Sequence, residues 1–154
     1  MESFLVRVRD LLRGRATGAL GTLHEGAPSV SLVPFALVTG GAVIHISGLA
    51  AHTKDLEVDP RASLLVAAPE EGAEDLRALP RVTLQVHARV LEPGIAAYED
   101  GRRAYLDRFP GSEGIFGLGD FRLVALEFRG ARAVLGFAQA RTLSAAELEA
   151  VLAD

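Results

Sequence analysis

Residues 81–91 read Arg-Val-Thr-Leu-Gln-Val-His-Ala-Arg-Val-Leu, and this stretch decides the fold class of the chain. Its apolar and polar residues alternate, which is typical of a β-strand with one buried and one exposed face. Working outward, further strands are predicted at residues 16–24, 29–38, 42–47, 62–68, 121–129 and 133–137, the last two paired about Gly130. Because short turns join most of these strands and no long βαβ alternation occurs, an antiparallel barrel is expected.

Helices are predicted at both ends of the chain and between strands. They cover residues 4–13, 50–58 and 94–108, and a last helix opens at the capping box formed by Ser144 and Glu147. The fold class is therefore mainly β with flanking helices, an antiparallel barrel of six to seven strands. Residues 1–154 are expected to form a single domain, since the length suits one domain.

Composition and charge narrow the class of protein. With 49% apolar residues, 23% charged residues and a net charge of −4, the chain is expected to be globular rather than disordered. The negative net charge argues against a general nucleic-acid-binding protein, which usually carries a basic surface. Cysteine is absent, which excludes disulfides and thiolate chemistry and fits a reducing compartment. No secretory signal is evident at Met1, so a cytoplasmic location is expected.

Two further patterns exclude a metal site and a membrane partner. The four histidines are His24, His45, His52 and His87, and no two of them have the spacing of a metal motif. Residues 26–51 carry no charged side chain, but Pro34 and the Gly40-Gly41 break oppose a membrane helix. This stretch is interpreted as two buried strands and a turn.

The passage from Ser47 to Leu56 carries the clearest chemical signal. A strand ends, the chain turns, and a helix begins whose first N–H groups are free and carry a partial positive charge. Ser47 and Thr53 add hydroxyl donors and Lys54 adds a full positive charge, a set that suits a phosphate dianion. The alternative is a capped surface helix with a solvated lysine.

The strand over residues 29–35 adds a second signal. Pro34 cannot donate to a ladder, which indicates an edge strand or a bulge. Free backbone groups on such an edge suit a flat heteroaromatic ring. The alternative is that the proline protects the edge from aggregation.

Several motifs together resemble a known family. They are V-P-F-A-L at residues 33–37, H-T-K-D-L-x-x-D-P-R-A-S-L-L-V at 52–66 and G-D-F-R-L at 119–123. The chain is similar to the pyridoxamine 5′-phosphate oxidase-related flavin-binding split-barrel proteins, and most of all to their haem-utilisation branch. The resemblance implies an FMN-binding split barrel, a homodimer with FMN in grooves between the subunits, and haem as a further ligand or substrate.

The resemblance also implies roles for individual residues. Ser47, Thr53 and Lys54 would hold the FMN phosphate, with His52 nearby. The residues that would meet the flavin ring, through backbone groups or from the partner subunit, are Ser31, Leu32, Val33, Gln85, Gly136 and Phe137. Leu135 and Ala138 replace glycines of the family motif, so they are expected to crowd the flavin.

Three hypotheses about function follow. The first is an FMN-dependent oxidoreductase acting on a small reduced heterocycle, a nicotinamide nucleotide or haem, with the flavin carrying the redox chemistry. The second is a non-catalytic module that stores or senses FMN or haem. The third is a barrel that has lost its cofactor. The sequence shows no Arg-x-His signature with which pyridoxamine phosphate oxidases hold their substrate, so that activity is not expected.

Overall fold

The structure is a computed structural model and describes residues 3–153. Its α-helices are α1 (Phe4–Gly14), α2 (Ala51–Val58), α3 (Ala96–Arg108), α4 (Glu113–Phe116) and α5 (Ala145–Ala153), and its short 3-10 helices are η1 (Leu76–Ala78) and η2 (Pro110–Ser112). Its strands are β1 (Thr17–His24), β2 (Ala27–Pro34), β3 (Ala36–Val38), β4 (Gly41–Ser47), β5 (Arg61–Ala67), β6 (Arg81–Leu91), β7 (Phe121–Gly136) and β8 (Gln139–Ser144).

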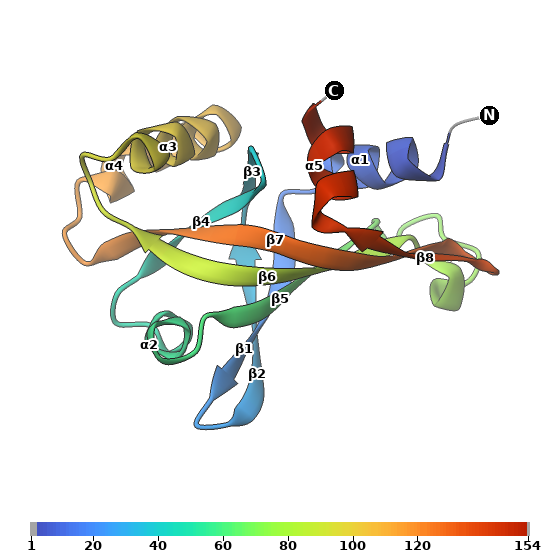
Figure 1. The fold of residues 1–154 in the computed structure, drawn as a ribbon, viewed down its shortest axis with the longest axis horizontal. Coiled ribbons are helices and arrows are strands. Elements are labelled where there is room, and N and C mark those ends of the chain that lie inside the picture. Colours follow the sequence, from blue (N-terminus) through green and yellow to red (C-terminus); the bar gives the residue numbers. More distant parts are fainter. Residues whose placement is uncertain (1–2, 154) are drawn as a thin grey trace.

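All the strands join one sheet with antiparallel neighbours. The order is β2-β1-β5-β6-β7-β4-β3, and β8 pairs with β7. The long strands β6 and β7 form its middle, α3 and α4 lie near one end of β7, and α1 and α5 lie toward the other (Figure 1). The turn of the β1–β2 hairpin and α2 lie on the opposite side of β6 and β7 from these helices (Figure 1). The predicted antiparallel barrel with flanking helices is confirmed.

Two strand predictions were wrong in their boundaries. The hairpin expected about Gly130 does not form, because β7 runs unbroken from Phe121 to Gly136 and reverses only beyond it. Gly130 lies within the strand beside a bulge: Gln85 pairs with Gly130 and Val86 pairs with Phe128, so β7 holds one extra residue, Arg129. The strand expected over residues 29–38 is split, because Phe35 turns into the core between β2 and β3.

The helix signals at both ends of the chain are confirmed. The Ser3 side chain accepts a hydrogen bond from the amide of Val6 and so caps α1. At α5, the Glu147 amide donates to Ser144 Oγ at 3.0 Å, and the Ser144 amide donates to Glu147 Oε1 at 3.2 Å. These reciprocal bonds form the capping box that the sequence predicts.

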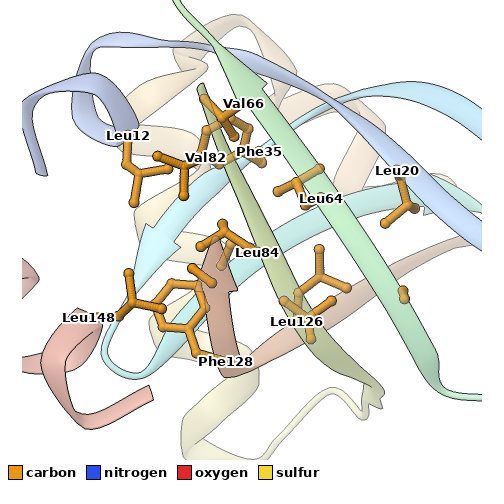
Figure 2. Close-up of a cluster of buried hydrophobic side chains, with 14 of the residues drawn as sticks. Leu12, Leu20, Phe35, Leu64, Val66, Val82, Leu84, Leu126, Phe128 and Leu148 are labelled. Atoms are coloured by element: carbon orange, nitrogen blue, oxygen red, sulfur yellow. The ribbon is translucent and has the colours of Figure 1, made fainter. Parts of the chain in front are cut away.

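The main hydrophobic core lies between the sheet and helices α1 and α5 (Figure 2). Its labelled members are Leu12, Leu20, Phe35, Leu64, Val66, Val82, Leu84, Leu126, Phe128 and Leu148. They come from strands and helices far apart in the sequence, so burial of this apolar surface holds α1 and α5 against the curved sheet. A second, smaller core includes Tyr105 and Leu123 under α3.

The uncharged stretch over residues 26–51 forms β2, β3 and β4, with a reversal at Gly40. It therefore belongs to the sheet, as the sequence predicts. Within residues 3–153, no helix is long and apolar enough to span a bilayer.

Candidate functional site

The turn between β4 and α2 is built by hydrogen bonds around Ser47. Thr53 Oγ1 donates to the Ser47 carbonyl oxygen at 2.5 Å, and the Leu49 amide donates to Ser47 Oγ at 3.2 Å. Thr53 is buried, so its hydroxyl stabilises the turn instead of facing outward. Ser47 Oγ accepts within the turn, and its own hydrogen has no acceptor among the described residues.

The first amides of α2 face this turn. The Thr53 and Lys54 amides donate to the Ala50 carbonyl oxygen at 3.2 and 3.4 Å. The amides of Ala51 and His52 have no hydrogen-bond acceptor within residues 3–153, as helix geometry dictates for a first turn. Two N–H groups and one hydroxyl are therefore available to an acceptor from outside.

Two cations accompany these donors. Lys54 is exposed, and it is the single lysine of the chain. Arg122 of β7 lies beside Gly48, since a Cβ built on that glycine would lie 3.5 Å from the guanidinium carbon. Within the described residues, neither Lys54 nor Arg122 forms a salt bridge. Arg122 was missed in the sequence because it is far from the helix signal along the chain, and only the pairing of β4 with β7 brings it near.

Gly48 is required at this turn by close packing. Its amide donates to the Asp120 carbonyl oxygen, and a Cβ on Gly48 would lie 2.8 Å from that same oxygen. A side chain here would force the β4–α2 turn away from the loop that precedes β7.

Replacing Gly48 with alanine is expected to destabilise the protein by about 1–3 kcal/mol, the usual cost of overpacking. The displaced turn should also reduce affinity for any anion bound by the first amides of α2. Urea unfolding and ligand titration measure the two effects. Gly111→Ala is the matched control, because a Cβ there meets nothing within 4 Å. Equal stability of both variants would contradict the close packing at Gly48.

His52 lies in the first turn of α2 and is half-buried. Its Nε2 atom is buried without a hydrogen-bond partner among the described residues. Burial lowers the pKa of His52, and the nearby Asp55 partly opposes this shift. A neutral ring with an unpartnered nitrogen is suited to contact a polar group of a ligand.

Asp55 forms a buried link that the sequence did not reveal. Its Oδ1 atom accepts a hydrogen bond from His24 Nδ1 at 2.7 Å, and its Oδ2 atom accepts one from Thr22 Oγ1 at 3.4 Å. The hydrogen bond to Asp55, and then its charge, raise the pKa of His24. The His24 side chain itself is 52% exposed. The pairing joins α2 to β1.

The edge strand β2 presents an apolar face. It pairs with β1 alone, which confirms the edge position that Pro34 indicates. Val30 is 70% exposed and Leu32 is 75% exposed, whereas Ser31 and Val33 point to the other face. Exposed apolar side chains gathered on one face are typical of a binding surface.

Gln85 shares this face of the sheet. The register places Val30, Gly21, Ser63 and Gln85 in one row across β2, β1, β5 and β6. Gln85 Oε1 accepts a hydrogen bond from Ser63 Oγ at 2.9 Å. Gln85 lies three strand spacings, about 14 Å, from β2. One ligand can therefore contact both Gln85 and β2 only if it extends across this face of the sheet.

The turn at Gly136 and Phe137 lies away from the β4–α2 turn of the same chain. Ser47 pairs with Phe121 at the start of β7, and Gly136 ends that strand. A strand of 16 residues spans on the order of 50 Å. Phe137 is 65% exposed, and Leu135 is buried in the core, so Leu135 does not project toward a ligand. Ala138 is exposed with φ at +59°, in the turn.

Two cavities accompany these features. One of about 1040 Å³ lies between α3 and α5 over β3, β4 and β7, and it contains none of the residues predicted for the site. It is lined by four arginines and four acidic residues, Arg13, Arg89, Arg103, Arg108, Asp100, Asp107, Glu127 and Glu149. Several of these pair with each other, as Arg89 does with Glu127 at 2.8 Å. The other, of about 590 Å³, lies beside Gln85 on β6, β7 and β8.

Among residues 3–153, no three histidine, aspartate or glutamate side chains are grouped so that they could hold an ion. His45 instead stacks on Phe116, with ring centres 3.9 Å apart, and burial lowers its pKa.

Comparison with known proteins places these features in a family. The family model described as Pyridoxamine 5'-phosphate oxidase matches residues 5–135. Among solved structures, the heme binding protein from Mycobacterium smegmatis superposes with a TM-score of 0.87 and 29% sequence identity. The superposition covers 97% of this chain and 61% of that one.

Two named relatives share substantial sequence. The chloroplastic "Non-canonical heme oxygenase HOZ" of Arabidopsis thaliana is 38% identical over 86% of this chain, which spans 40% of the plant protein. "Heme oxygenase HutZ" of Vibrio cholerae is 30% identical, and the match covers 92% of this chain and 81% of HutZ.

Proposed function

Because this chain belongs to the pyridoxamine 5′-phosphate oxidase family, we propose that it is a haem-binding protein of the haem-utilisation type. Its relatives are named as heme oxygenases and as a heme binding protein, which favours haem over FMN as the principal ligand. The FMN-dependent oxidoreductase expected first from the sequence is thus the second candidate.

One observation carries this proposal: the β4–α2 turn offers hydrogen-bond donors to an anion, and the edge strand β2 offers an exposed apolar face. Haem is a flat apolar ring with two carboxylates. The exposed face of β2 offers Val30 and Leu32 to the ring. Lys54 and Arg122 form no salt bridge within the described residues, although Arg122 Nη1 donates to the Gly119 and Phe121 carbonyl oxygens. Both cations are suited to bind the carboxylates through charge-assisted hydrogen bonds.

The described residues fit such a ligand. The unpartnered Nε2 of His52 and the free amide of Ala51 are polar groups without an internal partner. The concern that Leu135 would crowd a bound ring does not arise, because Leu135 is buried. When bound, haem supplies the iron at which oxygen chemistry takes place. The chain would hold the carboxylates, cover the ring with apolar side chains and exclude water.

A homodimer is part of the proposal. Leu32, Ala19 and Leu65 lie in one row of the exposed sheet face, and an apolar face of this kind favours a second copy. Since Gly136 and Phe137 lie at the far end of β7, they are available to the site of the partner subunit. Light scattering should report twice the chain mass of 16.3 kDa.

One experiment distinguishes a haem-storage function from a haem-degrading function. The haem complex is incubated with ascorbate in air, and its Soret band is followed. Steady loss of the band with release of iron indicates degradation, and a stable band indicates storage. A single turnover per bound haem is sufficient for the distinction.

The second candidate, an FMN-dependent oxidoreductase, is favoured by the donor set at the turn. Ser47 Oγ–H and the amides of Ala51 and His52 suit a phosphate as well as a carboxylate. FMN titration followed by flavin fluorescence, and then turnover with NAD(P)H, tests this candidate. Flavin-dependent turnover would establish it, and FMN that remains free would discard it.

Replacing Lys54 with alanine is expected to weaken ligand binding by about 1.5–3 kcal/mol, the loss of one charge-assisted contact. The measurement is a haem titration monitored by absorbance. Arg77→Ala is the matched control, because Arg77 lies in the distant η1 segment and pairs with Asp75. Equal affinity of wild type and Lys54→Ala would remove Lys54 from the site.

The single lysine offers a direct second measurement. Apart from the amino terminus, Lys54 carries the only primary amine in the chain. Bound haem is expected to protect it from acetylation, as read by mass spectrometry. Modification at an undiminished rate in the haem complex would contradict the contact.

A further inference from the structure

A buried carboxylate lies directly beside the proposed anion site. Asp55 follows Lys54 in α2, and only 7% of its side chain is exposed. Because a carboxylate only accepts hydrogen bonds, His24 Nδ1 must carry the hydrogen that it shares with Asp55 Oδ1. Thr22 holds the second carboxylate oxygen. The proposed mechanism of ligand binding does not use this pair.

We propose that Asp55 and His24 are positioning residues of the β4–α2 turn: they fasten α2 to the β1–β2 hairpin, and the protonation of His24 sets how tightly the turn holds an anionic ligand. This inference rests on the proposed function, because it concerns the same turn.

The topology explains the positioning role. β1 pairs with β2 along its full length, from Thr17 opposite Pro34 to His24 opposite Ala27. Thr22 and His24 lie on the face of β1 that contacts α2, and the exposed apolar residues of β2 lie on the other face. Figure 1 shows α2 beside the β1–β2 hairpin. The hydrogen bonds from Thr22 and His24 to Asp55 therefore fix α2, which carries Lys54 and the free first amides, against β1.

The charge of His24 explains the effect of protonation. An uncompensated carboxylate next to Lys54 would repel an anionic ligand, and protonated His24 cancels that charge. The pKa of His24 is raised from its ordinary value of 6.5. The positive charge is thus complete well below that raised pKa, and it is lost as the pH rises through it. Affinity for an anion should fall in the same direction.

Other charged groups lie on the elements around this pair. β1 and β2 carry none besides His24. The others are Glu25 on the hairpin turn, His52, Lys54 and Glu57 on α2, Asp59 and Arg61 just after it, and Arg81, His87 and Arg89 on β6. Comparing each variant with wild type over the same pH range cancels their contributions and that of the ligand itself.

The test is a series of haem titrations between about pH 6 and pH 9, where histidine loses its charge. The wild-type affinity is expected to fall on the order of threefold to tenfold more than that of His24→Gln, which keeps a side-chain donor but no titrating charge. In Asp55→Asn the loss of affinity linked to His24 should move to lower pH, because the His24 pKa is no longer raised by the carboxylate. His87→Gln is the control and should follow wild type.

A measurement without ligand tests the contact between His24 and Asp55 directly. In NMR titration, the His24 ring should titrate above 6.5, and Asp55→Asn should lower that midpoint. A His24 titration midpoint at or below 6.5 would contradict the proposed contact with Asp55. Equal pH profiles of haem affinity in wild type and His24→Gln would contradict the role of His24 protonation. If wild type binds haem at no pH but the His24 midpoint is raised, the proposed function is rejected and the contact between His24 and Asp55 is confirmed.

Discussion

Replacing Leu32 with aspartate is expected to convert the dimer to a monomer and to abolish tight haem binding. Leu32 is 75% exposed in one chain, at the centre of the apolar face of β2. In the proposed dimer this face is covered, so each subunit would bury an unpaired carboxylate. The cost is about 3–5 kcal/mol for a buried charge without a partner, enough to separate the subunits at micromolar concentration.

Light scattering and haem titration measure the two effects. Leu76→Asp is the matched control, because Leu76 is an exposed leucine of η1 outside the proposed interface. It should leave both the mass and the affinity unchanged. A Leu32→Asp protein that stays dimeric would show that the subunits meet at another surface. A monomeric variant with full haem affinity would show that a single chain forms the whole haem site.

Replacing Phe35 with alanine is expected to destabilise the protein by about 3–5 kcal/mol, because a large side chain is removed from a core that cannot fully collapse. Phe35 is fully buried between β2 and β3, and its amide donates to the Ala16 carbonyl oxygen at 3.0 Å. The Arg108 guanidinium lies over its ring at 5.5 Å. The loss should appear as a lower urea midpoint at fixed protein concentration.

Phe137→Ala provides the comparison for Phe35→Ala. Phe137 is 65% exposed on the β7–β8 turn, so its removal should change stability by no more than about 0.5 kcal/mol. If the partner's turn reaches the ligand, Phe137→Ala should weaken haem binding without unfolding the protein. A Phe35→Ala protein as stable as Phe137→Ala would contradict the position of Phe35 in the core.

Much of the fold is predictable because its signals are local. The alternation over residues 81–91 identifies β6, and the capping box at Ser144 identifies the start of α5. Pro34 indicates an edge strand because proline cannot donate to a ladder, and β2 is indeed an edge. The β4–α2 turn was found for the same reason, since Ser47 and Lys54 are close in the sequence.

The features that were missed depend on contacts between distant segments. Gly130 favours a turn by composition, but β7 takes up Arg129 as the extra residue of a bulge and continues through Gly130. Asp55 and His24 are 31 residues apart, and only the packing of α2 on β1 joins them. Arg122 reaches the β4–α2 turn through strand pairing. Thr53 was expected to face a phosphate, and its hydroxyl instead stabilises the turn through Ser47.

The most direct measurement is a titration of the purified wild-type chain with haem, followed by its absorbance spectrum. Our account predicts a saturable, shifted Soret band with one haem per subunit, and weaker binding in Lys54→Ala. A spectrum of free haem throughout the titration, or equal binding by wild type and Lys54→Ala, would contradict a haem site at the β4–α2 turn.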